Sequence, residues 1–317
     1  MSTESVDELD DRQLALQIAK AYYLDDLTKV QIADGMGMSR FKVARLLKLA
    51  RETGTVTISV NEDPQPEDML ATRLRHLLGL RECQVIPTGK AVNPRRQIAV
   101  AAAGYLATRL APHDVLGLAW GRTLATMTEY LVDLPPVKVV QLTGSVGSDL
   151  AISPTQILSQ ITQRSGGEAV PIMAPLVADS VEAMHMMRAQ TPIRRALDSF
   201  SEMTIAMLSV GSISPSTSQL WDNLDADAQR MLESSGAEGE VTGIFLTRSG
   251  EVVDVEPVRK FIGISAEELR AVPRTIIVAD GAVKAGSVLG AVRAGLANTL
   301  LVDVALATTM LGLLDGE

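Results

Sequence analysis

The sequence predicts a two-domain α/β protein, in which a small helical domain precedes a larger domain built on a mostly parallel β-sheet. Three observations lead to this prediction. The first sixty residues carry helical patterns, a polar segment with two prolines follows them, and short apolar runs then alternate with helical patterns. The length of 317 residues also suits two domains. We therefore expect domains at 1–60 and 67–317, joined by a linker at 61–66.

The small domain is expected to begin with two helices. Apolar residues at helical spacing predict a first helix over about 6–24: Leu14, Ile18, Ala21 and Tyr22. Thr28 stands three residues before Gln31, which is the spacing of a capping box and predicts the start of a short second helix. Gly35 and Gly37 are expected to end it.

A third helix is expected to follow from Ser39, a favourable N-cap residue, to about Glu52. Its buried side would be formed by Val43, Leu46, Leu47 and Ala50. Alternating residues at 55–60 predict a strand beside these helices.

Seven extended apolar runs predict the strands of the larger domain: 83–87, 114–120, 137–142, 169–173, 204–210, 275–279 and 300–302. Helical patterns lie between most of them, among them 94–111, 156–165, 181–189 and 283–294. Such alternation is typical of a Rossmann-like parallel sheet with helices on both faces. In open sheets of this kind, ligands bind at the carboxyl ends of the strands, near the point where the strand order reverses.

Composition excludes several classes of protein. Hydrophobic residues make up 46% and charged residues 21% of the chain, which excludes a disordered protein. The most apolar stretch, 296–314, is interrupted by Asp303 and falls short of a membrane span, while the first eleven residues carry five acidic side chains. We therefore expect a cytoplasmic protein without a membrane partner.

No metal site or cofactor site is predicted. Cys83 is the single cysteine, and the three histidines are far apart in the sequence: His76, His113 and His185. The chain contains neither a GxGxxG nor a Walker A sequence, and no catalytic nucleophile motif.

The segment 28–47 has the pattern of a helix-turn-helix. Ala33 lets two helices approach closely, Gly37 supplies the turn, and Ile32, Val43 and Leu46 would fill the space where the helices cross. The net charge is 29 − 38 = −9, yet residues 35–51 hold five basic and no acidic side chains. An ordinary helical hairpin with a solvated basic face is the alternative.

If the segment reads double-stranded operator DNA, its second helix enters the major groove by its amino-terminal residues. The expected DNA-binding residues are Lys29, Gln31, Ser39, Arg40, Lys42, Arg45 and Lys48. Lys29 and Gln31 would hold the phosphate backbone. Arg40 and Arg45 are the expected specificity residues, because arginine commonly reads guanine.

Three small-residue turns at strand ends are candidates for a ligand site. In the first, Gly121 permits a close backbone approach, Arg122 adds a charge and Thr123 a hydroxyl, which together favour a phosphate. A plain strand-to-helix turn is the alternative.

The other two turns follow later strands. In one, Asp280 would bind sugar hydroxyls, Gly281 would keep the turn open and Lys284 would pair with a phosphate, with an exposed surface lysine as the alternative. The other turn contains Gly144 and Ser145. Three such turns suit a cradle for a polar ligand.

These segments together resemble the SorC family of bacterial sugar-responsive transcription regulators, sometimes grouped with DeoR-type proteins. The similarity covers nearly the whole chain and is carried by Ala21-Tyr-Tyr, Ile32-Ala-Asp-Gly-Met-Gly-Met-Ser-Arg, Leu118-Ala-Trp-Gly-Arg-Thr, Val140-Gln-Leu-Thr-Gly, Phe261-Ile-Gly-Ile-Ser and Gly281-Ala-Val-Lys-Ala. The resemblance implies a winged helix-turn-helix joined to an effector domain similar to ribose-5-phosphate isomerase and glucosamine-6-phosphate deaminase. It also implies homotetramers, as dimers of dimers, on DNA and a phosphorylated sugar as effector.

The chain departs from the family pattern on the sugar-facing side of the pocket. Asp280-Gly281 stands where the family usually has two glycines, Glu240 where it has an aspartate, and Val302-Asp303-Val304 where it has Thr-Asp-Glu. Glu240 therefore joins the expected effector-binding residues. The effector would be a sugar, an unusual polyol, a pentose or one of their phosphates.

The sequence thus predicts a DNA-binding regulator of carbohydrate genes that is controlled by a small sugar-derived effector and is not an enzyme. The alternative is a sugar-phosphate isomerase or deaminase with an accessory DNA-binding domain. Its catalytic base would be Asp280, Glu240 or Asp303.

Overall fold

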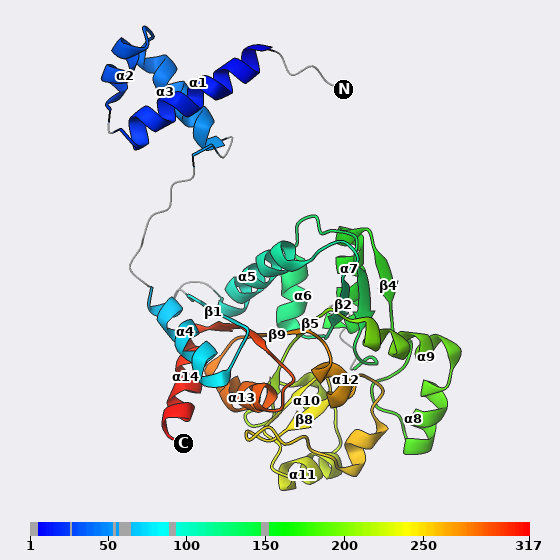
Figure 1. The fold of residues 1–317 in the computed structure, drawn as a ribbon. Coiled ribbons are helices and arrows are strands. Elements are labelled where there is room, and N and C mark those ends of the chain that lie inside the picture. The colour runs from blue at the N-terminus through cyan, green and yellow to red at the C-terminus, as the bar shows by residue number, and fades with distance from the viewer. Residues whose placement is uncertain (1–5, 26, 53–54, 57–64, 89–92, 147–151) are drawn as a thin grey trace. The chain divides into compact units, whose positions relative to one another are not determined.

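The chain divides into two compact units, Met1–Asp63 and Pro64–Glu317, and each is described by itself. The computed structural model describes residues 6–25, 27–52, 55–56, 65–88, 93–146 and 152–317 (Figure 1). Residues 57–60 of the strand predicted at 55–60 lie outside the described residues. Residues 61–64 of the predicted linker also lie outside them.

The amino-terminal unit contains three helices, α1 (Val6–Tyr23), α2 (Lys29–Gly35) and α3 (Arg40–Glu52). Their buried side chains form one hydrophobic cluster: Ala15, Ile18, Ala19, Ile32, Ala33, Val43, Leu46, Leu47 and Ala50. This cluster contains every side chain that the helical pattern of the third helix was expected to bury. Hydrophobic burial of one side of each helix therefore holds the unit together.

The ends of these helices follow the predicted capping. Thr28 and Gln31 form the capping box at the start of α2, and the Ser39 hydroxyl accepts a hydrogen bond of 3.2 Å from the Lys42 N–H at the start of α3. Between the two helices, Gly37 has φ = +62°, a left-handed conformation that favours glycine. The pattern of a helix-turn-helix is therefore present in the structure.

The larger unit is built on a seven-stranded sheet with the order β1-β10-β9-β5-β2-β3-β4, in which every neighbouring pair is parallel. The strands are β1 (Glu82–Ile86), β2 (Val115–Leu118), β3 (Lys138–Gln141), β4 (Glu168–Val170), β5 (Ile205–Leu208), β9 (Arg274–Ala279) and β10 (Thr299–Asp303). Each of the seven predicted apolar runs overlaps one of these strands, and the predicted α/β fold class is confirmed.

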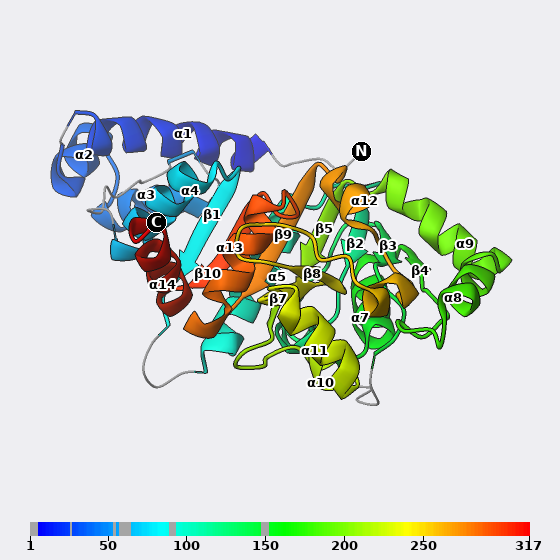
Figure 2. The same cartoon turned by 90° about the horizontal axis from the view of Figure 1, so that it is seen from below.

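Helices cover both faces of the sheet (Figures 1 and 2). One layer consists of α5 (Pro94–Arg109), α6 (Arg122–Thr128) and α7 (Pro154–Ser165), and the other contains α4 (Pro66–Leu78), α13 (Ala285–Arg293) and α14 (Val304–Asp315). The strands in the middle of the sheet are buried almost throughout, as expected for a parallel sheet covered twice.

The segment between β5 and β9 adds a second sheet that the sequence did not predict. Its antiparallel strands are β6 (Gly211–Ser212), β7 (Gly239–Val241) and β8 (Ile244–Leu246). Strands β7 and β8 are joined by a two-residue turn in which Thr242 and Gly243 both have positive φ, as a type I′ turn requires.

The remaining described elements are short. The helices are α8 (Val181–Arg188), α9 (Thr191–Asp198), α10 (Gln219–Asp222), α11 (Ala226–Ser234) and α12 (Ala266–Arg270), and the 3₁₀ turns are η2 (Ser199–Glu202), η3 (Glu256–Lys260) and η4 (Ala282–Lys284). Among the helices of the described part of the chain, none has the length and hydropathy that a membrane crossing needs.

Leu46→Ala should loosen the amino-terminal unit selectively. Leu46 is fully buried in the cluster of nine side chains, so its truncation should lower the free energy of unfolding of this unit by about 2–5 kcal/mol. Amide hydrogen exchange followed by mass spectrometry should show faster exchange in α1–α3, while β2, β5 and β9 exchange as in the wild type. Equal loss of protection in both units would contradict the division into independent cores.

Candidate functional site

The strand order of the large sheet reverses between β2 and β5. From β2 the chain adds β3 and β4 on one side, and from β5 it leads through β9 to β10 on the other. The segments that follow β2 and β5 therefore leave the sheet at its carboxyl edge in opposite directions, which opens a crevice. This is the place where the candidate ligand residues of the first two turns meet.

A small cavity occupies this crevice. Its volume is about 40 Å³, and it is lined by Arg95, Trp120, Gly121, Arg122, Thr123, Ser209, Val210, Gly211, Thr217, Ser218, Gln219, Glu240 and Lys284. Gly121, at the end of the β2 loop, has φ = +139°, and a Cβ there would lie 2.8 Å from the Ser209 hydroxyl oxygen. The loops after β2 and β5 can therefore approach each other this closely because residue 121 is glycine.

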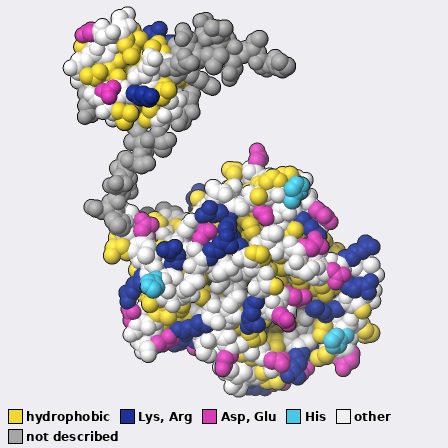
Figure 3. All heavy atoms as spheres, in the orientation of Figure 1, with side chains coloured by type: hydrophobic (Ala, Val, Ile, Leu, Met, Phe, Trp, Pro, Cys, Tyr) yellow, Lys and Arg dark blue, Asp and Glu magenta, His cyan; other side chains and the backbone are white. Residues whose placement is uncertain are grey.

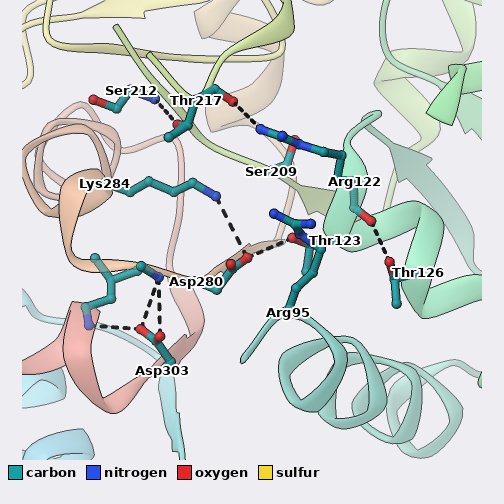
Figure 4. Close-up of polar contacts among 12 residues, drawn as sticks. Arg95, Arg122, Thr123, Thr126, Ser209, Ser212, Thr217, Asp280, Lys284 and Asp303 are labelled. Carbon is teal, nitrogen blue, oxygen red and sulfur yellow. Dashed lines mark hydrogen bonds and ion pairs between the residues drawn. The ribbon is translucent and has the colours of Figure 1, made fainter. Parts of the chain in front are cut away.

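Three basic side chains surround this space from three different elements (Figure 4). Arg122 begins α6, Lys284 ends η4, and Arg95 lies in the first turn of α5. The Nε atom of Arg95 is buried and has no hydrogen-bond partner. Burial lowers the pKa of Lys284, Asp280 opposes that shift, and Arg95 and Arg122 add to it, so both arginines are close enough to repel the Lys284 ammonium group.

The Asp280 carboxylate is the counter-charge within this group. It accepts a hydrogen bond of 2.9 Å from the Thr123 hydroxyl and lies 3.9 Å from the Lys284 Nζ (Figure 4). The next carboxylate, Asp303, accepts the Gly281 N–H at 3.3 Å and also caps α14 through the Leu306 N–H at 2.9 Å. Asp280 and Gly281 are not among the residues that line the cavity; Asp280 contacts the lining residues Thr123 and Lys284, and Asp303 stabilises the loop that carries both.

Glu240, in strand β7, also lines the cavity. Its side chain is buried and accepts hydrogen bonds from the Ser218 hydroxyl at 2.8 Å and from the Gly243 N–H at 3.1 Å. Burial raises the pKa of Glu240, against the opposing effect of these two donors and of Lys284. The lining of the cavity therefore combines three cations with one buried carboxylate.

The third predicted turn does not reach this cavity. Gly144 is buried, and its N–H donates to the Ile262 carbonyl at 2.8 Å. Ser145 is exposed, and its backbone exchanges hydrogen bonds of 2.9 Å with Ala174 and Leu176. These two residues follow β3, one strand away from the reversal point, and their backbone groups join loops of the domain.

Seven lining residues were not identified from the sequence: Arg95, Ser209, Val210, Gly211, Thr217, Ser218 and Gln219. Arg95 follows the Asn93-Pro94 start of α5, a pattern that predicts a helix but no ligand. The Thr217 carbonyl accepts a hydrogen bond from Arg122 at 3.3 Å. The Ser209 position could have been found from the apolar run 204–210, since the residue ending that strand reaches the same edge of the sheet as Gly121.

The predicted DNA-binding residues of the amino-terminal unit are all exposed: Lys29, Gln31, Ser39, Arg40, Lys42, Arg45 and Lys48. Two of them also serve the fold. The Gln31 side-chain oxygen accepts the Thr28 N–H at 2.9 Å, and the Ser39 hydroxyl oxygen caps α3, so their remaining side-chain N–H and O–H groups are the donors available to a phosphate. Lys29 places its Nζ 5.7 Å from the centre of the Tyr22 ring.

The geometry defines a protein in which a helix-turn-helix unit is attached to a doubly wound α/β domain with a polar pocket at its strand-order reversal. Residues 64–312 match the family model described as "Putative sugar-binding domain". The chain belongs to this family, and its predicted resemblance to SorC-type regulators is confirmed.

Two curated relatives match almost the full length. The transcriptional regulator LsrR of Enterobacter sp. (strain 638) is 26% identical over 312 residues, which cover 96% of this chain and 94% of LsrR. The deoxyribonucleoside regulator of Bacillus subtilis (strain 168) is 27% identical over 301 residues, with coverage of 92% and 95%.

One solved structure shares the fold over both units. The full-length sorbitol operon regulator SorC from Klebsiella pneumoniae has a TM-score of 0.73 and 24% sequence identity, and the match covers 95% of this chain and 99% of SorC.

Glu240→Gln should change how stability depends on pH. The folded-state pKa of Glu240 is raised, so its favourable contribution is complete below pH 4.5 and is lost as pH rises through the folded-state pKa. The free energy of unfolding of the wild type should therefore fall relative to the variant above pH 4.5, by at most about 1.4 kcal/mol per pH unit.

Denaturant titrations between pH 4 and pH 8 measure this difference. Glu233→Gln, an exposed carboxylate on α11, is the matched control and should leave the pH dependence as it is in the wild type. If the free energies of unfolding of the wild type and Glu240→Gln differ by the same amount at every pH in this range, folding does not raise the pKa of Glu240.

Proposed function

We propose that this protein is a DNA-binding transcription regulator of carbohydrate genes whose DNA binding is controlled by a small phosphorylated sugar or polyol. The observation that carries the proposal is the pocket at the strand-order reversal, lined by three cations and a buried carboxylate, combined with a helix-turn-helix whose second helix exposes its cations. We further propose that it acts as a homotetramer, a dimer of dimers, in the cytoplasm, as the SorC-type resemblance implies.

The exposed side of α3 supports a duplex as the partner. Arg40, Lys42, Arg45 and Lys48 are exposed, whereas the apolar side of the same helix is buried in the unit. Phosphate contacts hold a protein on the duplex and base contacts select the sequence, so a helix that presents cations from its first turn onward can provide both. The names of the curated relatives, which describe transcriptional regulators, support the same conclusion.

The pocket supports a ligand with one anionic end and one hydroxyl-rich end. Arg95, Arg122 and Lys284 would hold a phosphate, because charge-assisted hydrogen bonds from guanidinium and ammonium groups are the strong ones. Glu240 and Asp280 would accept hydrogen bonds from sugar hydroxyl groups. A neutral sugar adds no negative charge to that of Asp280 beside the three cations, so the phosphorylated form is favoured.

The hydrogen bonds and ion pairs of the three candidate bases favour a regulator over a sugar-phosphate isomerase or deaminase. Both oxygens of Glu240 accept hydrogen bonds, and Asp280 is engaged by Thr123 and Lys284. Asp303 holds the backbone of the turn at Gly281 and caps α14. A general base must reach the proton that it removes, and these carboxylates are instead occupied by the fold or directed at the cation group.

Arg40→Ala and Arg45→Ala should each weaken binding to a duplex selected by the wild-type protein from a random pool. Loss of a bidentate base contact costs about 1–3 kcal/mol, which corresponds to an increase in Kd of about 5- to 150-fold. Mobility-shift titration measures it. Lys20→Ala, an exposed charge on α1, is the control and should cause a smaller loss.

Thr123→Ala and Lys284→Met should abolish the response to ligand but leave DNA binding intact. In a thermal-shift screen of free and phosphorylated sugars and polyols, the wild type should be stabilised by a phosphorylated compound, and both variants should lose that shift. Lys138→Met, which removes a cation at the start of β3, the opposite end of the sheet, is the matched control. Turnover of the stabilising compound by the wild type, lost in Asp280→Asn, would instead support the enzyme.

A further inference from the structure

Phe41 is an exposed aromatic residue in the first turn of α3. Its side chain is 73% exposed, whereas the other three phenylalanines of the chain, Phe200, Phe245 and Phe261, are buried or half-buried. A phenyl ring in water forgoes the free energy of burial, and here nothing in the helical core of the unit requires it. Figure 3 shows that hydrophobic side chains reach the surface of this unit beside Lys and Arg.

Helix geometry places Phe41 at the centre of the exposed side of α3. Ala50 is fully buried and stands nine residues, or two and a half turns, further along, so the two side chains leave the helix in opposite directions. Arg45 and Lys48 fall one and two turns after Phe41 on the same side. If α3 enters the major groove, Phe41 therefore points at base edges rather than at a strand backbone.

We propose that Phe41 reads a thymine of the operator by packing against its C5 methyl group, an inference that rests on the proposed DNA-binding function. A phenyl ring neither donates nor accepts a conventional hydrogen bond, and the thymine methyl is the apolar group of the major-groove edge. The Arg40 guanidinium lies 5.1 Å from the ring centre of Phe41. A guanine read by Arg40 should therefore neighbour the thymine read by Phe41.

The test compares the full-length wild type with Phe41→Ala on chemically matched duplexes. A duplex is first selected by the wild type from a random pool, and each thymine in it is then replaced singly by uracil, which removes one methyl group and keeps the base pair. Burial of one methyl group is worth about a fourfold change in Kd. Leu24→Ala, which shortens an apolar side chain that is 75% exposed and lies outside α3, is the matched control.

At one thymine position the wild type and Leu24→Ala should bind the uracil duplex about fourfold more weakly, and Phe41→Ala should bind both duplexes equally. Circular dichroism of each variant confirms that the helices form. The inference is overturned if Phe41→Ala still distinguishes thymine from uracil at every position where the wild type does. It is also overturned if the substitution changes the oligomeric state in sedimentation while base preference stays, which would assign Phe41 to a contact between copies.

Failure of the underlying function gives a different result. A wild-type protein that enriches no duplex from the pool would overturn the proposed DNA binding itself. A wild-type protein that enriches one, with the same base preference as Phe41→Ala, would leave DNA binding in place and reject the role of Phe41 alone.

Discussion

The hydrogen bond between Thr123 and Asp280 joins two loops that are 157 residues apart in the sequence, and the pocket depends on it. Asp280 is also the carboxylate nearest to Lys284, whose ammonium group is partly desolvated and repelled by Arg95 and Arg122. Without this carboxylate the three cations would face one another in a poorly solvated space. An anionic ligand can relieve the same repulsion, so the arrangement of charges also explains why the site favours an anion.

The sequence predicted the large sheet well because strands covered on both faces read as continuous apolar runs. It did not predict the small sheet, whose strands have two or three residues and give no measurable period. The Thr242–Gly243 turn between apolar residues was a usable hairpin signal there. The amino-terminal helices could be predicted from capping residues and apolar periodicity, because both signals depend on residues that are close together in the sequence.

The structure brings together only some of the residues predicted for the ligand site, and the reason is physical. Gly121, Thr123 and Lys284 meet at the reversal of strand order, while Gly144 and Ser145, which have a similar local pattern, follow a strand further out. Strand order is a property of the whole sheet and is not encoded near any one turn. Arg95 was missed for the same reason. Its place in the pocket is set by how α5 packs against the sheet and not by its neighbours in the sequence.

The size of the pocket constrains how a ligand could act on DNA binding. Its volume of about 40 Å³ has room for a few water molecules, whereas pockets for small organic ligands hold about 300 Å³ or more. A sugar phosphate that used Lys284 and Glu240 together would therefore need a wider arrangement of the lining residues than the one in this structure. A ligand shifts an equilibrium only by its difference in affinity between two states, and the wider arrangement supplies the second state. By reciprocity, operator DNA that favoured the closed arrangement would weaken the ligand by the same factor.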